Sequence, residues 1–195
     1  AVWTSNEKGD RDIWMIRDLN ALLNEEQTPE MVQLTSGAQN QDRPDICKGV
    51  VVWQDFDLNN SDWDIHLYNS NWSSPTAINI TPTTNGSDQQ KPKVYVGEPI
   101  EELGIQEVYV AWEDNRNGNS NLDVYFLHGL LDNERERFVA VETIGMATAS
   151  GNQYEPDLNI NRCKNELVLG FTDNSQGDLN VFFKTIEIGS GAPKV

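Results

Sequence analysis

A fourfold recurrence is the feature of this sequence that most constrains its fold. Each copy has an apolar run that ends in an aromatic residue, a turn rich in Asp, Asn and Gly, and an Asp or Asn that opens a second apolar run. The aromatic residues are Trp3, Trp53, Trp112 and Phe171, and the second runs open at Asp12, Asp64, Asp123 and Asn180. Self-similarity at a nearly fixed period indicates a modular architecture.

A second marker recurs in register with the first. The pattern Gln-x-x-Pro-x-aliphatic occurs at Gln41–Ile46, Gln89–Val94 and Gln153–Leu158, each time before the next aromatic run. A period of 50 to 59 residues, with short strands between turns, is typical of a propeller blade. We therefore predict an all-β fold: a β-propeller of about four four-stranded blades in a single domain, residues 1–195. The blade units are approximately 1–43, 44–91, 92–155 and 156–195.

The two ends of the sequence suggest how such a ring would close. The sequence starts inside a predicted second strand of a blade, and Ala192–Val195 resembles the opening of a first strand. Pairing of the two termini would then complete one blade. The alternative is that these blades are a segment of a larger propeller.

Charge and hydropathy limit the partners and the location. The 31 acidic and 14 basic residues give a net charge of −17, which argues against nucleic acid because phosphates require clusters of Lys and Arg. No apolar run reaches the roughly 20 residues of a transmembrane segment. Because the sequence begins at Ala1 within a predicted strand, we expect that an upstream segment was removed, either a signal peptide or a segment lost at a proteolytic boundary. The expected location is extracytoplasmic: secreted, at the cell surface or in the periplasm.

Two histidines form the first candidate site. His66 and His128 lie two and five residues after Asp64 and Asp123, so they have opposite parity along their strands. Opposite parity is what facing surfaces of adjacent blades need, so we predict that both imidazoles lie at the interface of the second and third blades. Two imidazoles in an acidic surround suit a transition metal, copper preferred as a low-coordinate Cu(I) site. The alternative is that both are ordinary strand residues.

An acidic turn forms the second candidate site. Asp55, Asp57 and Asn59 alternate along the chain, and Asp62 and Asp64 follow, which places oxygen ligands as calcium loops do. Asp and Asn also favour tight turns for reasons of their own backbone. The alternative cofactor is therefore calcium in a structural role.

No motif for catalysis stands out in the sequence. It has no Gly-x-Ser-x-Gly, no His-Glu-x-x-His and no phosphate-binding glycine loop. We therefore expect a binding protein rather than an enzyme. Its candidate partners are a metal ion, surface proteins or glycans. The competing class is a surface scaffold or a glycan-binding propeller without functional metal.

Two family resemblances bear on these expectations. The segments Val51–Asp55 with Asp64–Tyr68, and Val110–Gly118 with Asp123–Tyr125, resemble TolB-like propeller repeats of secreted and surface proteins. This resemblance implies a propeller fold and no single function. The histidine pair is also similar to the site of methanotroph surface copper proteins, where two His and an oxidised Trp hold copper. That resemblance implies His66, His128 and Trp63 as ligands and a role in metal acquisition.

Overall fold

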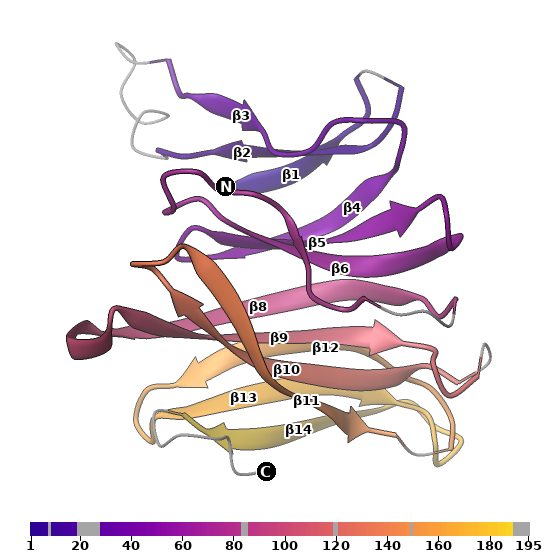
Figure 1. Ribbon diagram of the computed structural model, residues 1–195. Helices are drawn as coiled ribbons and strands as arrows, with labels where there is room; N and C mark the ends of the chain where they lie inside the picture. The colour runs from indigo at the N-terminus through magenta and orange to yellow at the C-terminus, as the bar shows by residue number, and fades with distance from the viewer. Residues whose placement is uncertain (8, 19–27, 83–85, 119–120, 149, 189–195) are drawn as a thin grey trace.

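The computed structural model describes residues 1–7, 9–18, 28–82, 86–118, 121–148 and 150–188, and this part of the chain is all-β. The strands form four antiparallel sheets of three or four strands, as Figure 1 shows. The first sheet holds β1 (Val2–Ser5), β2 (Asp12–Ile16) and β3 (Met31–Gln33). The second holds β4 (Gln41–Cys47), β5 (Val50–Asp57), β6 (Asp62–Asn69) and β7 (Ile78–Asn79). The predicted all-β fold is confirmed.

The third and fourth sheets follow in chain order. The third holds β8 (Gln89–Ile100), β9 (Ile105–Asp114), β10 (Asp123–Asp132) and β11 (Arg137–Ala147), with a 3-10 turn, η1 (Glu101–Leu103), between β8 and β9. The fourth holds β12 (Gln153–Asn161), β13 (Glu166–Asp173) and β14 (Asn180–Glu187). Each sheet is therefore a meander of strands that are neighbours in sequence.

The sheets share one register around the recurring aromatic residue. Its cross-strand partner is Trp14 for Trp3, His66 for Trp53, Tyr125 for Trp112 and Phe182 for Phe171. Two residues further along, an aspartate follows in three of the sheets, as Asp55, Asp114 and Asp173. The shared register lets one sheet be compared with the next position by position.

The Gln-x-x-Pro segments form bulges in the first strands of three sheets. Register shifts interrupt β4, β8 and β12 at this motif. The residue before each proline has a left-handed backbone, with φ of 54° at Arg43, 52° at Lys91 and 54° at Glu155. A bulge leaves one residue out of the ladder and bends the strand, so the motif shapes the start of each of these sheets.

Hydrophobic clusters join each sheet to the next. Side chains alternate along a strand, so the second and third sheets bury both faces. Trp53 and Val51 pack with Ile13 and Met15 of the first sheet. Two further clusters lie between the second and third sheets and between the third and fourth. These clusters contain fully buried residues such as Val52, Trp112 and Leu169.

The four sheets stack in chain order, and Figure 1 shows the first and last at opposite ends of the molecule. Packing runs between neighbours, with β4 against β1 and β2, β8 against β4, β5 and β6, and β12 against β8, β9 and β10. The strand expected at Ala192–Val195 lies outside the described residues. In the described part, no helix has the length and apolarity to span a membrane.

Candidate metal centre

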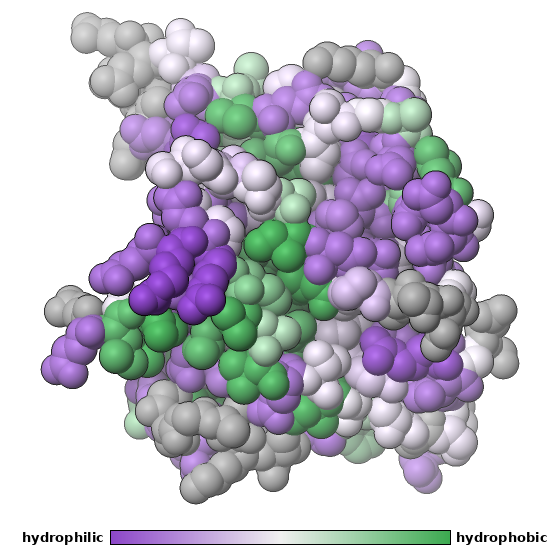
Figure 2. Space-filling view, viewed as in Figure 1, coloured by the Kyte–Doolittle hydropathy of each residue, from purple (hydrophilic) through white to green (hydrophobic). Residues whose placement is uncertain are grey.

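Four carboxylates face one another where β5 runs into β6. Asp57 lies directly opposite Asp62, and Asp55 directly opposite Asp64. Because residues two apart share a face of a strand, all four side chains lie on the face that carries Trp53 and His66. Like charges placed directly opposite in a sheet are destabilising. Hydrophilic side chains gather over these ends of β5 and β6 in Figure 2.

The turn between the strands is held by its own side chains. Asp57 accepts hydrogen bonds from the backbone N–H of Asn59 (2.8 Å) and from the side-chain amides of Asn59 (3.0 Å) and Asn60 (3.2 Å). Ser61 has a φ of 58°, and its N–H donates to the Asp57 carbonyl. These contacts hold Asp57 at the end of β5 and reverse the chain direction, so that β6 begins at Asp62 opposite Asp57.

Three of the carboxylates form one compact cluster. Asp57, Asp62 and Asp64 each offer an oxygen, and the three oxygens lie within 4.8 Å of one another. Asp62 is 0% exposed and neither of its oxygens has a hydrogen-bond partner. Asp64 is 2% exposed; Oδ2 accepts from the Asn79 amide (2.9 Å), whereas Oδ1 has no partner. Buried carboxylate oxygens without partners are costly, so this cluster calls for a cation or for protons.

The pKa values of the cluster express the same conflict. Burial raises the pKa of Asp62, and the carboxylates of Asp57 and Asp88 raise it further. Burial also raises the pKa of Asp64, and the neighbouring Asp62 and Asp57 add to this, against the hydrogen bond from Asn79. Within the described residues no Lys or Arg forms an ion pair with Asp57, Asp62 or Asp64.

The dimensions of the cluster suit a hard divalent cation. Calcium takes six to eight oxygens at about 2.4 Å, so ligands on opposite sides of the ion are about 4.8 Å apart. An adjoining pocket of about 220 Å³ gives access, and Asp57 and Asp64 line it. Its other lining residues are Gln39, Asp55, Asn59, His66 and Asn79. Carboxylate and amide oxygens dominate this set, which is the donor chemistry that calcium prefers.

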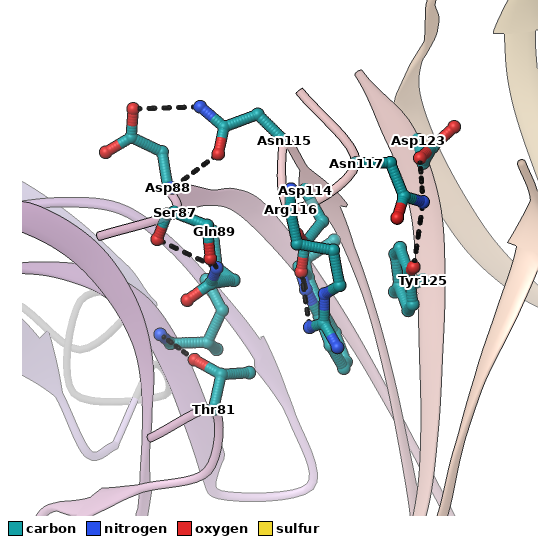
Figure 3. Close-up of polar contacts among 12 residues, drawn as sticks. Thr81, Ser87, Asp88, Gln89, Asp114, Asn115, Arg116, Asn117, Asp123 and Tyr125 are labelled. Carbon is teal, nitrogen blue, oxygen red and sulfur yellow. Dashed lines mark hydrogen bonds and ion pairs between the residues drawn. The ribbon is translucent and has the colours of Figure 1, made fainter. Parts of the chain in front are cut away.

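In the third sheet, an arginine side chain balances the charge of the equivalent pair of carboxylates. Asp114 and Asp123 stand opposite each other, as Asp55 and Asp64 do. The Arg116 guanidinium donates to Asp114 Oδ2 (2.5 Å), and the Asn117 amide donates to Asp123 Oδ2 (2.7 Å), as Figure 3 shows. The second sheet has no such cation at its turn among the described residues.

His66 lies beside the acidic cluster. Its Nδ1 is 3.8 Å from Asp55 Oδ2, its ring centroid is 5.9 Å from that of Trp53, and its side chain is 24% exposed toward the pocket. Burial lowers the pKa of His66, against the opposite effect of the Asp55 carboxylate. The imidazole is therefore neutral near pH 7 and able to accept a metal.

His128 lies in a different environment. It is 3% exposed, stacks on Tyr109 at 4.9 Å between ring centroids, and places Nε2 3.3 Å from Glu107 Oε1. Tyr109 belongs to the cluster between the third and fourth sheets, whereas Trp53 beside His66 belongs to the cluster between the first and second. The two imidazoles thus point away from the interface that we expected them to share, and the structure does not bring them into one site.

Trp63 is also separate from both histidines. Its ring packs against Phe56 at 5.2 Å between centroids, and the Arg11 guanidinium lies 5.9 Å over it. Trp63 is three residues from His66, an odd spacing that places the two on opposite faces of β6. The predicted set of His66, His128 and Trp63 is therefore spread over three environments.

The predicted calcium residues lie together. Asp57, Asp62 and Asp64 form the cluster, and Asp55 and Asn59 line the adjoining pocket. Asp55 is engaged elsewhere, because Oδ2 accepts from the Trp53 indole N–H (3.1 Å). Sequence reasoning missed Asn79 and Gln39. Asn79 on β7 lies directly opposite His66 on β6, and no local sequence pattern predicts this pairing.

No model of a protein family matches this sequence, and no curated protein matches it either.

Proposed function

We propose that this chain is a calcium-binding protein whose ion sits between β5 and β6, on Asp57, Asp62 and Asp64. The single observation that carries the proposal is Asp62, fully buried with both oxygens unpartnered beside two other carboxylates. A bound Ca²⁺ would supply the missing partners and cancel the repulsion across the turn. The role of the ion would be structural, since the ligands close the hairpin of β5 and β6.

The comparison with the third sheet supports this proposal. There the opposed carboxylates keep Arg116 as a permanent countercharge, whereas the second sheet has more carboxylates and, among the residues that the structure describes, no countercharge at the equivalent turn. A cation from solution is the simplest replacement for the missing guanidinium.

We further propose a β-propeller arrangement for the four sheets, either as a small ring or as part of a larger one. Support comes from the packing of consecutive sheets and from their first strands. Residues of β4, β8 and β12 line one common pocket of about 290 Å³, as expected for strands nearest a propeller axis. An extracytoplasmic location remains a proposal that agrees with calcium binding, because extracellular calcium modules work at about 10⁻⁴–10⁻³ M.

Calcium titration of the EDTA-treated protein tests the proposed function. We expect about one Ca²⁺ per chain by calorimetry and a rise in the unfolding temperature. Asp62→Asn should abolish both, whereas Asp123→Asn, the matched change at the third sheet, should keep the calcium response. Absence of any response in the unaltered protein would contradict the proposal.

Copper remains a prediction, and the same preparation tests it. Of the three predicted copper ligands, His66, His128 and Trp63, only His66 lines the pocket beside the carboxylates. A Cu(I) titration that depends on both His66 and His128 would favour the copper hypothesis over calcium.

A further inference from the structure

A second pocket gathers charged side chains from three sheets, and its basic residues come from two of them. It has a volume of about 290 Å³ and lies where β4, β8 and β12 meet. Its lining residues are Arg43, Pro44, Lys91, Pro92, Lys93, Glu155 and Pro156. All belong to the Gln-x-x-Pro segments or follow them directly, so the recurring bulge builds this pocket.

The backbone of the bulges directs charged residues into the pocket. Arg43, Lys91 and Glu155 occupy the equivalent left-handed position, with φ between 52° and 54°. That conformation favours Gly or Asn, yet the chain places long charged side chains there. The cost of about 1 kcal/mol or more at each non-glycine site is met in part by hydrogen bonds from neighbouring sheets. Gln54 Oε1 accepts the Lys91 N–H (3.0 Å), and Glu113 Oε1 accepts the Glu155 N–H (2.7 Å).

The pocket is mainly basic, whereas the protein as a whole is strongly acidic. The chain has 14 basic and 31 acidic residues, but three of the pocket's four charged side chains are basic. Lys91 Nζ donates to the buried carboxylate of Glu113 (2.9 Å). Arg43 and Lys93 form no ion pair with any other described residue. Two uncommitted cations therefore face the pocket beside one fixed ammonium group.

We propose that this pocket binds a compact multivalent anion, with inorganic phosphate as the simplest representative. Arg43 would supply a planar fork that can make two parallel hydrogen bonds to phosphate oxygens, and Lys93 would supply a point charge. Lys91, held by Glu113, would keep its remaining N–H donors toward the ligand. The three prolines offer no N–H groups, so recognition depends on side-chain charge.

Glu155 allows a test of the direction in which a substitution changes the affinity for the anion. Its carboxylate is the one acidic group lining the pocket, and it opposes an anion there. Its removal should therefore strengthen binding, while removal of Arg43 or Lys93 should weaken it. A general effect of the protein's net charge would not depend on where the substitution lies.

The experiment is a titration of the full chain with sodium phosphate in EDTA, followed by calorimetry and by backbone amide NMR shifts. We expect saturable binding that weakens as NaCl is raised, because exposed charges are screened. Arg43→Gln and Lys93→Gln should each weaken binding by about tenfold or more, the range for a lost hydrogen bond to a charged group. Glu155→Gln should tighten binding by about twofold to fivefold. The control is Lys164→Gln, which removes an exposed lysine on the β12–β13 turn and should leave the affinity unchanged.

Several results would overturn the proposal. One is the absence of saturable binding in the unaltered protein, and another is equal weakening by Lys164→Gln and Arg43→Gln. Circular dichroism of the Arg43→Gln and Lys93→Gln variants separates loss of binding from loss of fold. The two residues lie on different sheets, so the two substitutions test the pocket independently. Phosphate binding that persists in Asp62→Asn would show that this pocket works apart from the calcium centre.

Discussion

The effect of Asp62→Asn on stability should depend on calcium: the substitution should stabilise the protein in EDTA and leave it less stable than the unaltered protein when calcium is bound. In EDTA the change removes one of three carboxylates whose oxygens lie within 4.8 Å of one another. Two unit charges 4.8 Å apart repel by about 1 kcal/mol in water and by about 3 kcal/mol at an effective dielectric constant of 20. Because burial raises the pKa values of Asp62 and Asp64, protonation relieves part of this repulsion. We therefore expect a gain of about 1–2 kcal/mol in unfolding free energy.

Scanning fluorimetry converts that gain into a temperature. For a chain of this size 1 kcal/mol corresponds to about 2–4 °C, so Asp62→Asn should melt roughly 2–8 °C higher than the unaltered protein in EDTA. At a calcium concentration 100-fold above the dissociation constant, the unaltered protein should gain about 2.7 kcal/mol. The variant should gain little, and the order of the two melting temperatures should reverse.

The control for net charge is Asp178→Asn, an exposed carboxylate on the turn before β14. It removes the same unit of charge and should leave both the melting temperature in EDTA and the calcium response nearly unchanged. If Asp62→Asn were destabilising in EDTA, or if it kept the full calcium shift, the account of this centre would be refuted.

Three further predictions concern pH, copper and packing. Without calcium, the raised pKa of Asp62 means that the folded state binds more protons from pH 3.8 upward, so stability should fall as pH rises through that window. His66 has a lowered pKa and gives the opposite slope below pH 6.5, so the difference in melting temperature between the unaltered protein and Asp62→Asn isolates the carboxylate. If copper binds in the pocket beside the carboxylates, His66→Ala should reduce copper stoichiometry by elemental analysis while His128→Ala leaves it unchanged; equal loss in both would show a shared site. Urea unfolding should show a loss of about 3–5 kcal/mol for the fully buried Phe126→Ala and under about 1 kcal/mol for Phe183→Ala, which is 72% exposed; equal losses would contradict the packing of the fourth sheet.

The contrast between those two phenylalanines follows from the register of the sheets. Phe126 stands opposite Ala111, the residue before Trp112, and Phe183 stands opposite Gly170, the residue before Phe171. The positions are equivalent, but the fourth sheet covers Phe126 and no described sheet covers Phe183. The sequence pattern predicts the position of both side chains, and only the packing of sheets determines their burial.

The recurring aromatic, turn and Gln-x-x-Pro signals were sufficient to predict an all-β fold. They depend on local turn chemistry and on alternation along strands, which the sequence displays directly. The histidine interface was harder to predict for a definite physical reason. Parity shows that His66 and His128 have opposite orientations relative to their own Asp, but it does not show which face of a sheet meets which neighbour. His66 shares its face with Trp53, which packs on the first sheet, and His128 shares its face with Tyr109, which packs toward the fourth.

The acidic turn was easier to predict because its geometry is local. A strand, a four-residue turn and a returning strand place Asp57 against Asp62 whatever the other sheets do. The basic pocket shows the opposite case, since Arg43, Lys91 and Lys93 come together only when the first strands of two sheets pack side by side. Sites within one hairpin can thus be read from spacing, and sites between sheets require the packing.

The second and third sheets also differ in how the charge of their turns is balanced. Both hold an Asp that accepts from the indole N–H of the recurring tryptophan, Asp55 from Trp53 and Asp114 from Trp112. The third sheet follows its Asp with Arg116, whose guanidinium pairs with the buried Asp114 carboxylate. The second sheet adds further carboxylates instead, and no basic side chain of the described residues pairs with Asp57, Asp62 or Asp64, so protons or an ion from solvent would balance their charge. Asp57 lies two residues after Asp55, as Arg116 lies two residues after Asp114. Asp57→Arg should therefore abolish the calcium response while the protein remains folded in EDTA. Calorimetry and melting in EDTA measure the two outcomes separately, and a persisting calcium response would contradict the equivalence of the two turns.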